Sequence, residues 1–289
     1  MTFTLSLSTT DNKKTGQRSR HRVRSLISYC KFVPLLFLLV FLGSLSSHGA
    51  LIKSGKAPAD ARVPILIYHR FGPVVADSMT VTTTVFESHL KYLRENGYTV
   101  IPLRQLVNYY RGHAQPPPPK SVVITADDGH KSVYTDMFPL IKKYHIPVTL
   151  FIYPSAISNA SYAMTWDQLR EIKKSGLIEI QSHTYWHPNF KKDRRRLSPS
   201  AYSKSVDMQL KKSKEKLEKE LGIRVDMLAW PFGIYDEDLE KEAAADGYMA
   251  AFTMVRRKSA VSDNIMALPR YLMTARDRDS AFRRLLLGR

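Results

Sequence analysis

The chain has 289 residues, enough for one large domain or two small ones, and its 44% hydrophobic content excludes an intrinsically disordered protein. The single cysteine, Cys30, excludes a disulfide framework or a cysteine-based zinc site within one chain, so any metal must be bound by histidine and carboxylate side chains. A formal net charge of +18 favours an anionic partner. No zinc-finger, RNA-recognition or helix-turn-helix pattern accompanies that charge, and we expect no nucleic-acid partner.

The first 52 residues have the composition of an export signal. Residues 1–31 are basic, and residues 32–52 carry no Lys, Arg, Asp or Glu and begin FVPLLFLLVFLGSL. A basic, then apolar, then small-residue order is typical of a secretory signal peptide, and the uncharged stretch is also long enough for an uncleaved transmembrane anchor. Both alternatives predict an exported protein, periplasmic or extracellular, and the second adds a membrane contact through this segment.

After a linker at residues 53–61, candidate strands and helices alternate through residues 62–275, and residues 276–289 form a basic tail. The expected strands are 63–70, 98–103, 121–127, 148–154, 178–183, 225–230, 249–254 and 266–273. The expected helices are 82–97, 103–112, 133–145, 165–176, 201–222 and 236–247. Such alternation favours parallel strands joined by helical crossovers, and seven or eight units favour a barrel. Barrels of this kind place their chemistry at the carboxyl ends of the strands.

Two adjacent carboxylates end one of these strands, in the stretch SVVITADDGHKS at residues 121–132. Neighbouring carboxylates repel each other, and burying either is costly unless a cation or hydrogen bonds compensate. Asp127-Asp128-Gly129 is also good turn chemistry, so an ordinary turn is the competing interpretation.

A second polar group follows the strand at residues 178–183, in QSHTYWHPN. His183 and His187 are four residues apart and can point at one metal ion, although two structural histidines would give the same pattern. Two imidazoles together with one carboxylate form a set that leaves coordination positions open for water and substrate. A cation at that point would also explain why the two aspartates lie side by side.

Two further strand ends carry candidate residues. In AWPFGIYD, Trp230, Pro231, Phe232 and Gly233 predict a tight loop whose backbone amides face a ligand, or an ordinary strand-to-helix turn. In LIYHRFG, His69 ends the first strand and is either a general acid or a buried structural histidine. Trp186, Trp230 and Tyr185 could stack on sugar rings or belong to the core.

Together these motifs resemble the polysaccharide deacetylases of carbohydrate esterase family 4, the NodB-homology group, over residues 62–275. The pattern is most similar to members that act on poly-N-acetylglucosamine, and its most specific parts are TADDG and HTYWHPN in that order. The resemblance implies a distorted (β/α)7 barrel that removes N-acetyl groups from an N-acetylated polysaccharide and releases acetate. It also implies a divalent metal, usually zinc, bound by Asp128, His183 and His187, with Asp127 as general base.

By the same resemblance, the loop of Trp230, Pro231, Phe232 and Gly233 forms part of the substrate groove and offers an oxyanion-binding amide near Phe232. The chain departs from the family where Ala126 stands in place of a common Phe, and where Ala229 or Trp230 replaces an arginine of the third motif. Many members carry a catalytic histidine near the C-terminus, but no histidine follows His187 in this chain. In the subgroup that the chain resembles, an N-terminal histidine takes that role, and the resemblance implies His69 as the general acid. The alternatives are a catalytically inactive carbohydrate-binding protein of this fold, another metal-dependent amidohydrolase, and a basic nucleic-acid or membrane-surface protein.

Overall fold

The computed structural model describes residues 61–288. Residues 1–31, the expected signal or anchor segment 32–52 and the linker up to residue 60 lie outside the described residues. Within residues 61–288, no helix combines the length and apolarity required to cross a bilayer.

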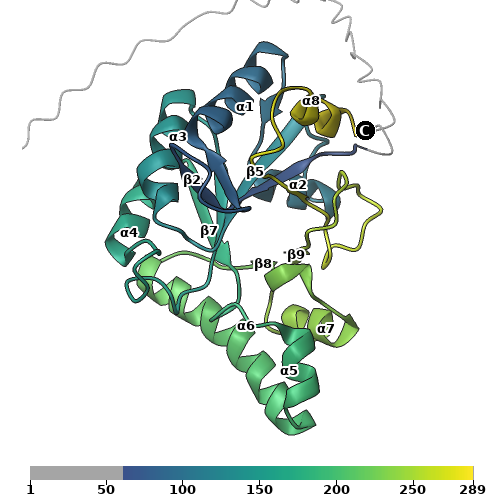
Figure 1. The fold of residues 1–289 in the computed structure, drawn as a ribbon. Coiled ribbons are helices and arrows are strands. Elements are labelled where there is room, and N and C mark those ends of the chain that lie inside the picture. The colour runs from purple at the N-terminus through teal and green to yellow at the C-terminus, as the bar shows by residue number, and fades with distance from the viewer. Residues whose placement is uncertain (1–60, 289) are drawn as a thin grey trace, which may run out of the picture. The chain divides into compact units, whose positions relative to one another are not determined.

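The described domain is built around one sheet of parallel strands (Figure 1). Its strands are β1 (Ile65–Tyr68), β4 (Thr99–Val100), β5 (Ser121–Asp127), β6 (Val148–Ile152), β7 (Ile178–Ser182), β8 (Met227–Ala229), β9 (Ala250–Phe252) and β10 (Tyr271–Leu272). They follow the order β10-β1-β5-β6-β7-β8-β9, and β4 pairs with β5 beside this path. A separate parallel pair is formed by β2 (Arg70–Gly72) and β3 (Thr80–Thr82).

The sheet curls until its two ends meet. The Leu268 amide donates to Ala251 and the Thr253 amide donates to Leu268, which places the segment before β10 beside β9. Because β10 then pairs with β1, main-chain hydrogen bonds continue around the barrel. The expected barrel of parallel strands is therefore confirmed.

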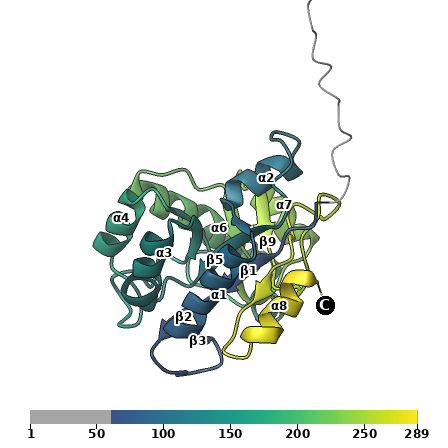
Figure 2. The same cartoon turned by 90° about the horizontal axis from the view of Figure 1, so that it is seen from above.

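Helices cover the outside of the barrel, as the view from above shows (Figure 2). They are α1 (Thr83–Glu95), α2 (Leu103–Tyr110), α3 (Phe138–Tyr144), α4 (Trp166–Lys174), α5 (Phe190–Arg196), α6 (Pro199–Leu221), α7 (Glu237–Ala245) and α8 (Asp279–Leu287), with a π-helical turn at Val133–Met137 (η1) and a 3-10 turn at Pro231–Gly233 (η2). Two helices begin or end at residues that the sequence marks as caps. Thr82 caps α1 by accepting from the Val85 amide, and Gly222 ends α6 in the left-handed conformation.

All six expected helices are present, whereas two others were not predicted. Helix α5 is too rich in charged residues to show an apolar period, and α8 lies in the segment expected to be a basic tail. Its Phe282, Leu285 and Leu286 are nevertheless buried. The strands expected at 98–103 and 266–273 shrink to the two-residue strands β4 and β10, because prolines at 102 and 269 lack the N–H that continued pairing needs.

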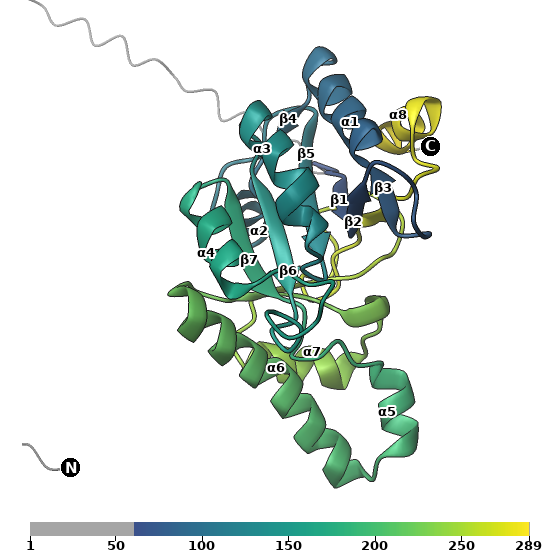
Figure 3. The same cartoon turned by 60° about the vertical axis from the view of Figure 1, so that its left-hand side comes forward.

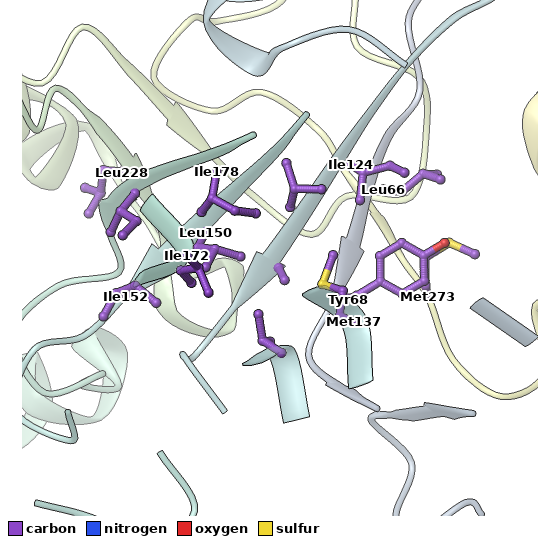
Figure 4. Close-up of a cluster of buried hydrophobic side chains, with 14 of the residues drawn as sticks. Leu66, Tyr68, Ile124, Met137, Leu150, Ile152, Ile172, Ile178, Leu228 and Met273 are labelled. Carbon is purple, nitrogen blue, oxygen red and sulfur yellow. The ribbon is translucent and has the colours of Figure 1, made fainter. Parts of the chain in front are cut away.

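Strand β5 is buried on both faces, as its Val and Ile content predicts. Val122, Ile124 and Ala126 pack toward the helices, in the core that Figure 4 shows in part, and Val123 packs inside the barrel. Side chains alternate along a strand, so Thr125 and Asp127 share the inner face with Val123. The strand therefore carries its last carboxylate into the barrel interior.

A buried histidine connects α1 to the C-terminal part of the domain. His89 is 1% exposed, its Nδ1 lies 2.9 Å from the Tyr68 hydroxyl, its Nε2 lies 2.6 Å from the Asp277 carbonyl, and its ring stacks on Phe282 at 3.9 Å. Burial lowers the pKa of His89 to about 4, against the opposing effect of the hydrogen bond to Asp277.

This histidine makes stability depend on pH. Below about pH 6.5 the unfolded chain binds a proton that folded His89 takes up only near its own pKa, so stability falls as the pH falls through that window. We expect this residue to remove about 2 kcal/mol of unfolding free energy between about pH 7 and about pH 5. Urea denaturation of wild-type protein and His89→Gln at both pH values checks this. The variant should lose less stability over that interval, and equal losses would contradict the assignment.

Candidate active site

The Asp-Asp-Gly stretch leaves β5 in a sharp turn at the carboxyl end of the sheet. Asp128 and Gly129 both have positive φ, at 73° and 74°. The left-handed backbone at Gly129 favours glycine, and a Cβ there would lie 3.0 Å from Cδ1 of Ile152 and 3.1 Å from Cδ1 of Ile157, so both methyl groups would have to shift. The turn directs Asp127 and Asp128 toward the same region from different angles.

Asp128, His183 and His187 form a compact group of potential metal ligands. The Asp128 Oδ1 atom lies 3.5 Å from His183 Nε2 and 3.8 Å from His187 Nε2. One ligand atom from each of the three residues lies within 4.8 Å of the others. His187, like Asp128, has a left-handed backbone, with φ of 60°. The structure therefore brings together the three residues that the sequence predicted as ligands.

Hydrogen bonds orient the two imidazoles. The Nδ1 atom of His183 lies 2.8 Å from the Ala229 carbonyl, so Nδ1–H donates and Nε2 keeps its lone pair for a cation. The loop between the histidines is held by Gln209 of α6, whose Oε1 accepts from the amides of Tyr185 and Trp186. Helix α6 thus fixes the position of His187.

A divalent cation fits this group. Asp128 Oδ1 is buried and has no hydrogen-bond partner among the described residues. Burial raises the pKa of Asp128, and the neighbouring Asp127 adds to the effect. Three ligands about 2.1 Å from a tetrahedral ion lie about 3.4 Å from one another, close to the separations between Asp128 and the histidines. One carboxylate and two imidazoles are also a donor set that zinc commonly takes.

Asp127 has a different partner. Its carboxylate accepts two hydrogen bonds from Arg270, at 3.0 Å from Nη1 and 2.8 Å from Nη2, and both side chains are buried. Burial alone would raise the pKa of Asp127, but the charge of Arg270, followed by that of His183, brings it below its ordinary value. The two neighbouring aspartates are therefore compensated separately, which the simple turn interpretation does not require.

Arg270 was missed from the sequence. The chain lacks the arginine expected in the third motif, and Arg270 supplies a guanidinium to Asp127 from a segment much later in the chain. Its signal was a single charge inside an apolar segment, MALPRYLM, where a buried cation needs a buried anion. Arg270 also donates to Thr125 Oγ1 and to the Thr253 carbonyl, so it connects three strands across the barrel interior.

His69 lies in the wall of the same cleft. A cavity of about 450 Å³ is lined by His69, Arg70, Met79, Asp127, Asp128, Tyr153, His183, His187, Trp230, Phe232 and Met254. His69 is buried, and its Nδ1 has no hydrogen-bond partner among the described residues. Burial lowers the pKa of His69, while the charges of Asp127 and Asp128 act in the opposite direction.

The loop from Trp230 to Gly233 forms another wall. Phe232 is 51% exposed, has φ of 56°, and its ring lies 4.5 Å from that of His187. Its amide is in the first turn of η2, where helical amides have no acceptor within the helix. Gly233 also has positive φ, and a Cβ there would lie 3.1 Å from the Met254 amide nitrogen.

The aromatic residues considered for sugar stacking differ in exposure. Trp230 is fully buried, and its Nε1 donates to the Met266 carbonyl at 2.8 Å, so it packs beneath the cleft. Pro231 is buried as well. Trp186 is 48% exposed and Tyr185 is half-buried, so Trp186 retains an open face.

A parallel barrel with this aspartate pair and histidine pair at its strand ends is the arrangement that the resemblance to the polysaccharide deacetylases implied. Residues 114–251, just under half of the chain, match the model of the polysaccharide deacetylase family. It is 26% identical over 211 residues to the poly-beta-1,6-N-acetyl-D-glucosamine N-deacetylase of Staphylococcus aureus strain MRSA252, covering 72% of this chain and 71% of that protein.

Solved structures of deacetylases share the fold. IcaB from Ammonifex degensii is 25% identical with a TM-score of 0.64, covering 75% of this chain and 93% of its own. The Streptococcus pyogenes deacetylase PplD, in complex with acetate, is 22% identical with a TM-score of 0.69, covering 78% of this chain and 98% of its own. The predicted fold class is thus confirmed, and the family match and the named relatives agree with the expected resemblance to polysaccharide deacetylases.

Proposed function

We propose that this protein hydrolyses N-acetyl groups of an N-acetylglucosamine-containing polysaccharide and releases acetate, with Asp128, His183 and His187 binding a divalent metal, most simply Zn²⁺. The observation that carries the proposal is the separate compensation of the two aspartates: Asp127 pairs with Arg270, and Asp128 faces the two histidines. A binding protein of the same fold has no need of both arrangements.

The metal would polarise the acetamide carbonyl and acidify water at the cleft. Asp127, kept ionised by Arg270, accepts the proton of the attacking water; each of its oxygens has a second lone pair beyond the one that accepts from Arg270. The Phe232 amide donates to the developing oxyanion. His69, on the cleft wall, donates a proton to the leaving sugar amine.

Acetate release tests this function. We expect the purified domain to release acetate from at least one of β-1,6-linked, chitin and peptidoglycan oligomers of N-acetylglucosamine. A chelator should abolish the activity, and Zn²⁺ or another divalent ion should restore it. Metal-loaded protein that releases no acetate from any of the three would contradict the proposal and favour a binding role.

We also propose that residues 32–52 direct export, either as a cleaved signal or as an uncleaved anchor in the cytoplasmic membrane. The support is compositional: an uncharged apolar stretch follows a basic one. Export would place the catalytic domain in the compartment of cell-surface polysaccharides. Mass measurement of the mature N-terminus distinguishes the two forms.

A further inference from the structure

Helix α5 places an unbalanced positive charge beside the catalytic cleft. Its seven residues contain five Lys or Arg side chains and a single acid, Asp193. The helix begins three residues after His187, and Figure 3 shows it beside the N-terminal part of α6.

The position of α5 is fixed by contacts with the cleft walls. Phe190, its first residue, is 2% exposed, and its ring packs edge-on against Trp230 at 6.3 Å. Asn189 caps the helix by accepting from the Lys192 amide. The Arg194 guanidinium donates to Asp238 at 2.9 Å and lies 3.3 Å from Asp236, in the segment that follows η2. Helix α5 thus bridges the two loops that carry His187 and Phe232.

Among the described residues, only two of the five cationic side chains of α5 form ion pairs. Arg194 has acidic partners, and Arg196 pairs with Asp193 at 3.1 Å. Lys191, Lys192 and Arg195 are exposed, and within residues 61–288 their side chains form no ion pair. Three cations that lie close together without acidic partners repel one another. Binding of an anionic ligand would reduce this repulsion and is therefore favourable.

The rest of the cleft mouth does not cancel this charge. Arg70 lines the cavity and is paired with Asp77, and Lys131 is exposed three residues after Asp128. Asp127 is neutralised by Arg270, and the exposed indole of Trp186 lies in the loop between the cleft and α5. Trp186 and the three cations without acidic partners therefore lie on the same stretch of chain as His187, between β7 and the end of α5.

We infer that α5 binds carboxylate groups of the substrate, so that the preferred substrate is an acidic N-acetylated polysaccharide; this inference rests on the proposed function. Lys191, Lys192 and Arg195 are the contacts, and Trp186 supplies a face for the intervening sugar. Each hydrolysis converts a neutral acetamide into a cationic amine on the polymer. Helix α5 therefore holds the substrate more strongly than the product, which favours product release.

Two chitin derivatives of equal length test the inference, because they differ only in charge. Carboxymethyl chitin carries a carboxylate where glycol chitin carries a hydroxyl. For wild-type protein, calorimetry at low salt should give about tenfold tighter binding of carboxymethyl chitin, and the preference should disappear near 0.5 M salt, where charges are screened within about 4 Å. The triple variant Lys191→Gln, Lys192→Gln, Arg195→Gln should lose the preference, since Gln preserves the helix but not the charge.

A matched control removes three exposed cations from the C-terminal half of α6: Lys211→Gln, Lys212→Gln and Lys219→Gln. This control variant should keep the preference for the acidic polymer. If the control variant also lost that preference, the preference would depend only on the net charge of the protein, and the inference would be overturned. Equal affinity of wild-type protein for both polymers would overturn it too. Acetate release from neutral N-acetylglucosamine oligomers reports separately on the proposed function, so the two can fail independently.

Discussion

Replacing Asp127 with Asn is expected to lower kcat by about 10³-fold, because the variant retains the shape of the side chain but cannot accept the proton of the attacking water. Asn keeps one acceptor for Arg270, so the domain should still fold, with a lower melting temperature because the arginine charge is no longer neutralised. Steady-state acetate release and metal content per chain are the measurements.

The metal content separates the roles of the two aspartates. Asp127→Asn should bind as much metal as wild type, whereas Asp128→Asn should lose both metal and activity, because Asp128 faces the two histidines. Near-normal turnover of a metal-loaded Asp127→Asn variant would disprove the base assignment. Loss of metal from that variant would show that Asp127 acts as a ligand.

Replacing Arg270 with Met should have the largest effect on stability. The change leaves the buried Asp127 carboxylate without its cation, and breaking such a pair costs about 3–5 kcal/mol. We expect the pKa of Asp127 to rise once the cation that lowers it is removed, which would weaken its ionisation and reduce turnover near neutral pH. Chemical denaturation gives the first effect, and the pH dependence of kcat/KM gives the second.

A double-mutant cycle distinguishes the ion pair from simple loss of packing. Combining Arg270→Met with Asp127→Asn removes both charges, so the double variant should unfold at a higher denaturant concentration than Arg270→Met alone. Additive losses of stability would mean that Arg270 supports the barrel mainly through its bonds to Thr125 and the Thr253 carbonyl. Both results are measurable whether or not the variants retain activity.

The sequence was sufficient for the barrel and for the ligand group because both depend on local patterns. Buried Val and Ile runs define a strand such as β5, and parallel strands all end on one side of the sheet. Asp128 follows β5 and His183 follows β7, with only β6 between these strands in the sheet, so parallel topology brings the two residues to the same edge. The positive φ of Gly129 likewise agrees with the expected sharp turn.

Features that depend on long-range pairing were not predictable in this way. Arg270 finds Asp127 from 143 residues away, and no local period indicates that pairing. Helix α8 has buried apolar residues, but a count of its arginines suggested a tail. Trp230 was grouped with sugar-binding aromatics, yet its indole N–H donates to a carbonyl inside the core. In each case the partner, rather than the residue type, decides the role.

Asp128, His187 and Phe232 have left-handed backbone conformations, so the residues proposed to act in the site lower the stability of the domain. A side chain makes this conformation unfavourable by about 1 kcal/mol at each position, and glycine would relieve it. Two of the three positions would then lose a proposed metal ligand and the third would lose an exposed ring. Directed evolution that screens only for heat resistance would therefore enrich glycine at these positions and produce a sturdier barrel without a working site.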